Sequence, residues 1–275
     1  MRAKKSLGQH FLNSKHVLEQ IITAGKIQSN ENILEIGPGT GILTEALLKA
    51  GAQVTAIEKD HRAYELLQEK FLEEINAEKL KLTLGDILDE NLEPKILNLK
   101  SYALIANIPY YITGAILEKF LEHEPRPNRM ILLVQKEVAE RIVARPEQST
   151  GKSKESILSI SVKVFGEPKI IAKVPPGAFT PPPTVDSAIL SIENISDKKF
   201  ASSIKNNPDD IKEFFKIIRA GFAHKRKFLK RNLEQAIKKE NLDIIWEKLN
   251  LDEKVRAEDL TPQDWINLFN KKTSD

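Results

Sequence analysis

The chain contains no cysteine among its 275 residues, and this absence excludes disulfide bonds and thiolate metal sites. Long apolar runs are also missing, because the longest stretches, such as MILLV, are far too short to cross a bilayer. The basic N-terminal stretch MRAKKSLGQHFL lacks the apolar part of a signal peptide. We therefore expect a cytoplasmic protein that does not enter a membrane.

Neither sign of charge is in large excess. The chain has 42 Lys and Arg against 39 Asp and Glu, and the net charge of +3 is a weak indication of a polyanionic partner. The five histidines are scattered and lack the spaced pairs that zinc needs, so we expect no bound metal. With 41% hydrophobic and 29% charged residues, the composition is that of a globular protein.

Alternation of short apolar runs with amphipathic stretches is the main pattern between about residues 32 and 165. Five of the runs have the features of strands: NILEIG, QVTAIE, LKLTLGD, YALIANI and RMILLVQK. Ahead of them, Ser14 is the expected N-cap of an amphipathic helix that runs through Ile22. This alternation predicts an α/β fold with a doubly wound sheet.

The pattern changes in the last third of the chain. Residues 168–192 contain two β-like runs joined by a proline-rich loop, and from Asn207-Pro208 onward the apolar period is helical. We therefore predict two domains with a boundary near residue 195. An α/β domain would span 1–195, and a smaller all-helical domain would span 196–275.

The motif EIGPGTG at 35–41 joins the first predicted strand to a helix expected from about Thr40. Gly37, Gly39 and Gly41 would let the backbone approach a ligand closely, and the start of the following helix favours a negative group. A tight turn without a ligand is the alternative for such a pattern on its own.

Two acidic residues narrow the choice of ligand. Glu58 lies about 20 residues beyond Gly37, where a carboxylate can accept both hydroxyls of a ribose, in a nicotinamide cofactor as in other nucleosides. Glu35 lies beside the glycines, where its charge would repel a pyrophosphate but attract an ammonium group. An amino acid joined to a nucleoside meets both conditions, so the pattern predicts S-adenosylmethionine.

Polar side chains also follow the third and fourth predicted strands. Asp86 is placed to accept a hydrogen bond from an adenine amino group, with a helix N-cap as the alternative. Asn107 closes the run YALIAN although asparagine is rare in strands, and ligands of such sheets bind beyond the carboxyl ends of the strands. Its amide oxygen and a backbone carbonyl of NIPY can accept from an adenine amine and hold the nitrogen toward a sulfonium methyl.

Pro109 and Tyr110 complete this second motif. The proline stiffens the turn, and the tyrosine ring offers a face on which an extruded base can stack. Taken alone, Asn107 would be assigned to an Asx turn and Tyr110 to packing under the loop.

A dense basic segment, HKRKFLKR at 224–231, lies in the predicted helical domain, where Phe228 and Leu229 are expected to anchor it as a helix. A solvated face is the usual explanation of such a run, but Asp and Glu are absent from residues 219–233. We therefore predict an RNA-backbone surface formed by Lys225, Arg226, Lys227, Lys230 and Arg231.

Seven segments together carry a resemblance that covers nearly the whole chain: SLGQHFL at 6–12, EIGPGTG at 35–41, IE at 57–58, GD at 85–86, NIPY at 107–110, VQKEVAERI at 134–142 and PPGAFTPPPTVDSA at 175–188. With them the chain resembles the KsgA-type small-subunit ribosomal RNA adenine N6,N6-dimethyltransferases, close relatives of the erythromycin-resistance methyltransferases. It departs from that family at Tyr111, where Asn is frequent, and HKRKFLKRNL matches loosely.

The resemblance implies a Rossmann-like methyltransferase sheet and roles for single residues. It implies that His10 and Leu12 close over the cofactor and that Phe179 faces the target base opposite Tyr110. It further implies that Gly37, Glu58 and Asp86 contact the methionine part, the ribose and the adenine. The expected cofactor-binding set is His10, Leu12, Glu35, Gly37, Gly39, Glu58, Asp86, Ile87 and Asn107, and the expected catalytic set is Asn107, Pro109, Tyr110 and Phe179.

The function implied by this resemblance is methyl transfer from S-adenosylmethionine to N6 of two adjacent adenines near the 3′ end of 16S ribosomal RNA during ribosome biogenesis. Each adenine would receive two methyl groups. The partner would be the small ribosomal subunit, and the protein would act as a monomer. Two alternatives stay open: an adenine methyltransferase of large-subunit RNA, and a non-catalytic ribosome-assembly or nucleic-acid-binding factor. An oxidoreductase is disfavoured because it leaves residues 107–110 without a role.

Overall fold

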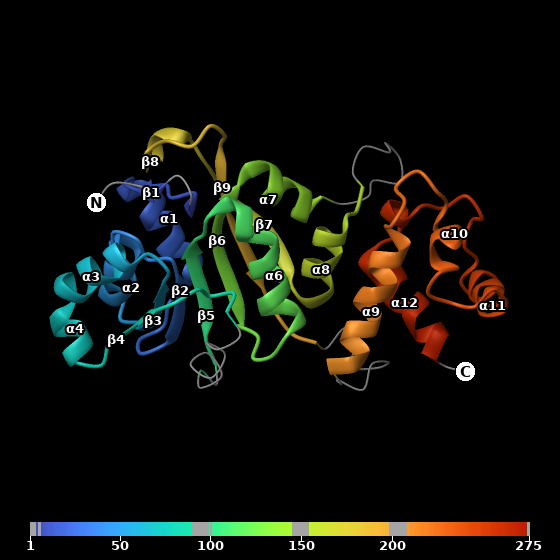
Figure 1. Ribbon diagram of the computed structural model, residues 1–275, viewed down its shortest axis with the longest axis horizontal. Coiled ribbons are helices and arrows are strands. Elements are labelled where there is room, and N and C mark those ends of the chain that lie inside the picture. Colours follow the sequence, from blue (N-terminus) through green and yellow to red (C-terminus); the bar gives the residue numbers. More distant parts are fainter. Residues whose placement is uncertain are drawn as a thin grey trace. The chain divides into compact units, whose positions relative to one another are not determined.

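The computed structural model describes residues 4, 7–89, 99, 101–144, 154–197 and 208–273 (Figure 1). Contacts divide the chain into two compact units. Unit 1 comprises Met1–Glu140 and Glu167–Ile195, and unit 2 comprises Arg141–Gly166 and Ser196–Asp275. These units differ from the limits predicted from the sequence in one segment, Arg141–Gly166. Its apolar helix α8 (Ile157–Phe165) packs against helices of unit 2, which explains why the segment groups with them.

Unit 1 is built around a seven-stranded sheet with the order β4-β3-β2-β5-β6-β9-β7. Its strands are β2 (Asn32–Ile36), β3 (Gln53–Glu58), β4 (Leu80–Leu84), β5 (Ala103–Asn107), β6 (Arg129–Gln135), β7 (Glu167–Val174) and β9 (Ser187–Glu193). The first five are parallel to one another, and β9 runs antiparallel to both β6 and β7. The five predicted strands are confirmed, and the two β-like runs of 168–192 form the antiparallel pair.

Helices alternate with these strands and pack against the sheet, which explains the continuous apolar runs (Figure 1). Successive strand residues point to opposite faces, yet Ile33 and Leu34 are both fully buried. The predicted N-cap is confirmed, because Ser14 Oγ accepts a hydrogen bond of 3.4 Å from the amide of Val17. Among the residues that the structure describes, the α-helices next to this sheet are α1 (Lys15–Gly25), α2 (Ile42–Lys49), α3 (His61–Lys70), α4 (Leu72–Asn76), α6 (Thr113–Glu122) and α7 (Lys136–Val143), the last of which continues into unit 2.

A second, two-stranded sheet joins the N-terminal segment, residues 7–12, to the proline-rich loop. Strand β1 (Phe11–Leu12) pairs antiparallel with β8 (Phe179–Thr180), which follows the short 3-10 helix Pro176–Ala178. Strands of two residues have no detectable period, so the sequence did not predict them. The pairing brings together two segments that are more than 160 residues apart in the chain.

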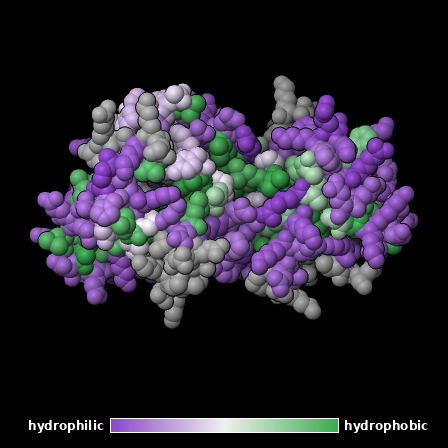
Figure 2. All heavy atoms as spheres, viewed as in Figure 1, coloured by the Kyte–Doolittle hydropathy of each residue, from purple (hydrophilic) through white to green (hydrophobic). Residues whose placement is uncertain are grey.

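Unit 2 is helical within its described residues. Besides α8 it contains α9 (Pro208–Gly221), α10 (Leu229–Leu233), α11 (Lys239–Leu249), the 3-10 helix Ala257–Asp259 and α12 (Pro262–Thr273). Its core is aromatic, with Phe214 stacked edge-on against both Phe215 and Phe269. Hydrophilic side chains dominate the face that it presents in Figure 2. None of the helices within the described ranges of the chain is long and apolar enough to cross a membrane.

The expected basic helix over residues 224–231 is wrong. Helix α9 ends at Gly221, residues 222–227 form turns, and α10 begins only at Leu229. The side-chain amide of Asn232 donates to the carbonyls of Gly221 and His224, at 2.6 and 3.1 Å, and so satisfies acceptors that a continuing helix would use. Leu229 is fully buried, as predicted, whereas Phe228 is 39% exposed and does not anchor the segment.

Candidate active site

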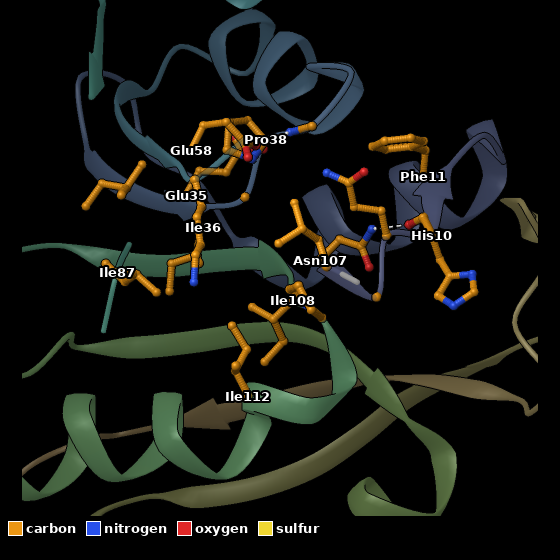
Figure 3. Close-up of a pocket in the computed structure, with 18 of the residues that line it drawn as sticks. His10, Phe11, Glu35, Ile36, Pro38, Glu58, Ile87, Asn107, Ile108 and Ile112 are labelled. Atoms are coloured by element: carbon orange, nitrogen blue, oxygen red, sulfur yellow. Dashed lines mark hydrogen bonds between the residues drawn. The ribbon is translucent and has the colours of Figure 1, made fainter. Parts of the chain in front are cut away.

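A cavity of unit 1 lies where the order of the strands reverses, between β2 and β5. Ligands of open α/β sheets bind at this point, beyond the carboxyl ends of the strands. The cavity has a volume of about 190 Å³. Its lining comes from the N-terminal segment, the glycine loop (residues 37–41), the ends of β3 and β4, and the NIPY motif (Figure 3).

The glycines of this loop have left-handed backbones, with φ of +64° at Gly37, +60° at Gly39 and +76° at Gly41. They serve different purposes. A Cβ on Gly41 would lie 2.6 Å from the ring of Phe71, so this glycine permits close packing of the loop. A Cβ on Gly37 would meet no atom within 4 Å, so this glycine borders open space on the cavity side.

Glu58, at the end of β3, holds the glycine loop from below. Its carboxylate accepts the amide hydrogens of Gly39 at 3.0 Å and Asp60 at 2.7 Å. The side chain is buried, and burial raises its pKa although both hydrogen bonds oppose that shift. A carboxylate has about four acceptor positions, so this group keeps the capacity to accept hydroxyl groups of a ligand.

Glu35 lies beside the same loop and is almost completely buried (Figure 3). Its Oε2 has no hydrogen-bond partner among the residues that the structure describes. Burial raises the pKa of this carboxyl to about 8, and the charge of Glu58 adds to the effect. An unpartnered buried oxygen is costly, so this position favours a ligand that donates hydrogen bonds.

Asp86 and Ile87 line the cavity after β4. Asp86 accepts from Lys59 Nζ at 2.6 Å and from the amide of Leu88 at 3.0 Å, so it also closes the turn that follows the strand. Partial burial raises the pKa of Asp86, but the hydrogen bond and charge of Lys59 outweigh it and leave the pKa below its ordinary value. Ile87 is buried and supplies an apolar wall.

Asn107, the last residue of β5, is oriented by the N-terminal segment. Its Nδ2 donates to the backbone carbonyl of His10 at 3.1 Å, drawn as a dashed line in Figure 3. The imidazole of His10 points away from the amide, and its Nδ1 lies 2.8 Å from the carbonyl oxygen of Pro181. This bond uses one of the two Nδ2 hydrogens and fixes the orientation of the amide, whose only acceptor for a ligand is Oδ1.

Tyr110 is held on two sides. Its hydroxyl lies 2.6 Å from Ser187 Oγ on β9, and its ring stacks on that of His10 with centroids 5.8 Å apart. Burial raises the pKa of this tyrosine. Pro109 precedes it with φ −57° and starts the turn after the strand. The neighbouring Tyr111 also lines the cavity and is 63% exposed.

Sequence reasoning missed one anchor of this site, Asp60. Its buried carboxylate accepts from Lys4 Nζ and Gln9 Nε2, both at 3.1 Å, and from Arg62 at 2.6 Å. Arg62 holds the pKa of Asp60 well below its usual range. These contacts fix the N-terminal segment beside Glu58. The motif SLGQHFL contains Gln9, but its partner lies 51 residues away and carries no local signal.

One predicted catalytic residue, Phe179, is not brought to the cavity. It is 2% exposed, lies in the hydrophobic core of unit 1 and pairs with Leu12 through β8 and β1. Leu12 itself lines the cavity. The remaining predicted cofactor and catalytic residues meet there: His10, Glu35, Gly37, Gly39, Glu58, Asp86, Ile87, Asn107, Pro109 and Tyr110.

The predicted RNA surface lies in unit 2, and one of its members differs from the rest. Lys230 Nζ forms ion pairs with Asp243 at 2.9 Å and Glu253 at 2.8 Å, and its side chain is only 20% exposed. The other four predicted side chains are exposed: Lys225, Arg226, Lys227 and Arg231. The part of the chain that the structure describes contains no group of three or more His, Cys, Asp or Glu that could hold a metal ion.

Comparison with known proteins gives matches over nearly the whole chain. The family model described as ribosomal RNA adenine dimethylase matches residues 1–274. A ribosomal RNA small subunit methyltransferase A from Dehalococcoides mccartyi is 38% identical over 96% of this chain and 87% of that protein. A protein of the same name from Nostoc sp. is 36% identical over 98% of both chains.

Two solved structures match over similar lengths. A dimethyladenosine transferase from Plasmodium falciparum is 30% identical, with a TM-score of 0.74 over 96% of this chain and 98% of that one. The 23S rRNA methyltransferase ErmE is 22% identical, with a TM-score of 0.68 over 95% and 99% of the two chains. At that identity the second match shows a shared fold alone.

Proposed function

The chain belongs to the ribosomal RNA adenine dimethylase family, and from this premise we propose that it transfers methyl groups from S-adenosylmethionine to N6 of two adjacent adenines near the 3′ end of 16S ribosomal RNA. Each adenine receives two methyl groups, and the protein acts on the small subunit as a cytoplasmic monomer. The names of the relatives that match nearly the whole chain support the small subunit as the partner. The large-subunit alternative has only the fold likeness to ErmE in its favour.

The orientation of Asn107 is the observation that carries this proposal. An exocyclic amine of adenine is a poor nucleophile, because its lone pair is delocalised into the ring. An oxygen that accepts at this point can align the amine and stabilise the charge that develops on its nitrogen. The bond from Nδ2 to the His10 carbonyl leaves Oδ1 in that role. A non-catalytic factor would not need this arrangement.

The cavity residues fit S-adenosylmethionine. Glu35 keeps a buried oxygen without a partner, which suits the ammonium of the methionine part, and Glu58 keeps acceptor capacity for the ribose hydroxyls. Asp86 and Ile87 suit the amino group and the apolar face of an adenine. When bound, S-adenosylmethionine supplies the methyl group on an electrophilic sulfonium.

The NIPY motif performs the remaining tasks on the target base. The Tyr110 ring, fixed between His10 and Ser187, provides a stacking face for a base taken out of its helix. Pro109 sets the turn that places this ring next to Asn107. The rigid turn therefore fixes Asn107 and the Tyr110 ring relative to one another. This reduces the entropy that is lost when the bound adenine reaches the reactive geometry.

An assay with both ribosomal subunits tests this function. The full chain is incubated with methyl-labelled S-adenosylmethionine and with small or large subunits from cells that lack the modification. We expect label in the small-subunit RNA only. Label in the large-subunit RNA alone would support the resistance-type alternative, and no label in either would support a non-catalytic factor.

A further inference from the structure

Unit 2 contains a cavity of its own, of about 360 Å³, whose lining residues all belong to that unit. It shares no lining residue with the cavity of unit 1. Its lining combines buried polar side chains, an aromatic ring and exposed cationic residues.

Two buried acceptors in this lining have no partner among the described residues. Asn232 is 1% exposed, and although its amide nitrogen is engaged by Gly221 and His224, its Oδ1 makes no hydrogen bond. Glu155 is 4% exposed, and its Oε1 accepts from Lys163 at 2.6 Å while its Oε2 is unpartnered. Buried acceptors are rarely left so, which indicates a ligand that donates hydrogen bonds.

The wall of the cavity offers a flat apolar surface. Phe222 lines it and is backed by Trp265, whose ring lies parallel to within 23° at 5.9 Å. Ile157, at the start of α8, is 37% exposed and lines it as well. A ring supported from behind in this way is a suitable stacking partner for a planar heterocycle.

The basic turn provides the rim. His224, Lys225 and Lys227 are exposed and line the cavity, and the described residues show no ion pair at either lysine. The acidic Glu258 also lines it, but its carboxylate is paired with Lys154. The net field at the entrance is therefore positive and suits a phosphate group.

We propose that this cavity binds one unpaired nucleotide of an RNA strand, whose base carries an exocyclic amino group. The base stacks on Phe222 and donates to Asn232 Oδ1 or Glu155 Oε2, and its phosphate lies at Lys225 and Lys227. An acidic peptide would engage the lysines, but its carboxylate side chains cannot donate to either buried acceptor. The inference rests on the proposed function in that it takes RNA as the partner of the chain.

Binding of short RNA to the full chain tests the proposal. Fluorescence anisotropy is measured with labelled octamers of cytidine and of uridine, because neither contains the adenine that the unit 1 cavity is proposed to accept. Cytosine carries an amino donor where uracil carries a carbonyl oxygen. We expect the cytidine octamer to bind about tenfold more tightly, as one hydrogen bond to a buried acceptor predicts.

Two tryptophan variants provide the matched comparison. Ile157→Trp fills the cavity and should remove the preference for cytidine, whereas Ile244→Trp changes an isoleucine that is 41% exposed on α11 and should keep it. Thermal unfolding of both variants checks that they fold. Lys227→Ala should weaken both octamers by the same factor, because phosphate contacts are independent of the base.

Equal affinity of the wild type for the two octamers, or no binding of either, would overturn the proposal. So would a folded Ile157→Trp that keeps the cytidine preference. The methylation assay on ribosomal subunits is independent of these results. Methylated small-subunit RNA without a preference for the cytidine octamer would therefore exclude the cavity from RNA binding and leave the proposed function intact. A preference for the cytidine octamer without methylation would support the cavity and contradict the proposed function.

Discussion

The side-chain amide of Asn107 donates its hydrogen bond to the backbone carbonyl of His10, a residue 97 positions earlier in the chain. The same His10 stacks on Tyr110 and contacts the carbonyl of Pro181 through Nδ1. The N-terminal segment thus orients both side chains of the NIPY motif that are proposed to hold the target base. It is fixed in turn by the contacts of Lys4 and Gln9 with Asp60.

Replacement of Asn107 by alanine should abolish most turnover and leave cofactor affinity nearly unchanged. Removal of one preorganised polar group from an active site costs on the order of 10²–10³ in rate. Single-turnover kinetics with saturating small subunits measures the loss, and calorimetry with S-adenosylmethionine checks the affinity. A variant with near-normal methylation would exclude Asn107 from the mechanism.

The sequence predicted the elements of the sheet and the site that have local patterns, but not the contacts between residues distant in the chain. The strands and the glycine loop carry local signals, because a buried parallel strand is a continuous apolar run and a left-handed turn needs glycine. The β1–β8 pairing and the Asp60 anchor depend on partners distant in the chain, which leave no local pattern. The basic run was expected to be helical because the spacing of its apolar residues is that of a helix. That spacing does not reveal the hydrogen bonds from the Asn232 side chain to the carbonyls of Gly221 and His224, where α9 ends.

Glu35 predicts a pH dependence of stability in the ligand-free protein. Its pKa in the folded state is about 8, against an ordinary value of 4.5, so between these values the folded state holds a proton that the unfolded state has lost. Stability from this group is therefore full below about pH 4.5 and is lost as pH rises through about 8. Glu35→Gln should lose less stability than wild type between about pH 4.5 and 8 in urea unfolding. Parallel curves for the two proteins would contradict this assignment.

Replacement of Phe179 distinguishes a role in core packing from a contact with the target base. Because it is 2% exposed in the core, Phe179→Ala should destabilise the fold by about 3–5 kcal/mol, whereas the rate per folded molecule should change little. Denaturant unfolding and turnover of the folded fraction measure the two effects. Unchanged stability with a lower rate would instead support the predicted contact of Phe179 with the base.

The proposed RNA contacts of the basic segment can be tested with Lys230, a lysine of the same segment, as the control. Lys225→Ala and Arg226→Ala should each reduce the slope of log affinity for small-subunit RNA against log salt by about one unit, because each lost phosphate contact releases fewer counterions. Lys230→Ala should leave the slope unchanged, since this lysine is paired with Asp243 and Glu253. Filter binding at several salt concentrations provides the slopes. An equal reduction of the slope in all three variants would show that Lys230 contacts RNA despite its ion pairs with Asp243 and Glu253.

Mass spectrometric mapping of methylated adenines in 16S ribosomal RNA tests the proposed methyl transfer itself. Unmodified small subunits are first allowed to react with the protein and labelled S-adenosylmethionine. We expect two adjacent N6,N6-dimethyladenosines near the 3′ end, which are absent when the Asn107→Ala variant replaces the wild type. Methyl groups elsewhere in the RNA, or the same pair of dimethyladenosines formed by the variant at the wild-type rate, would contradict this expectation.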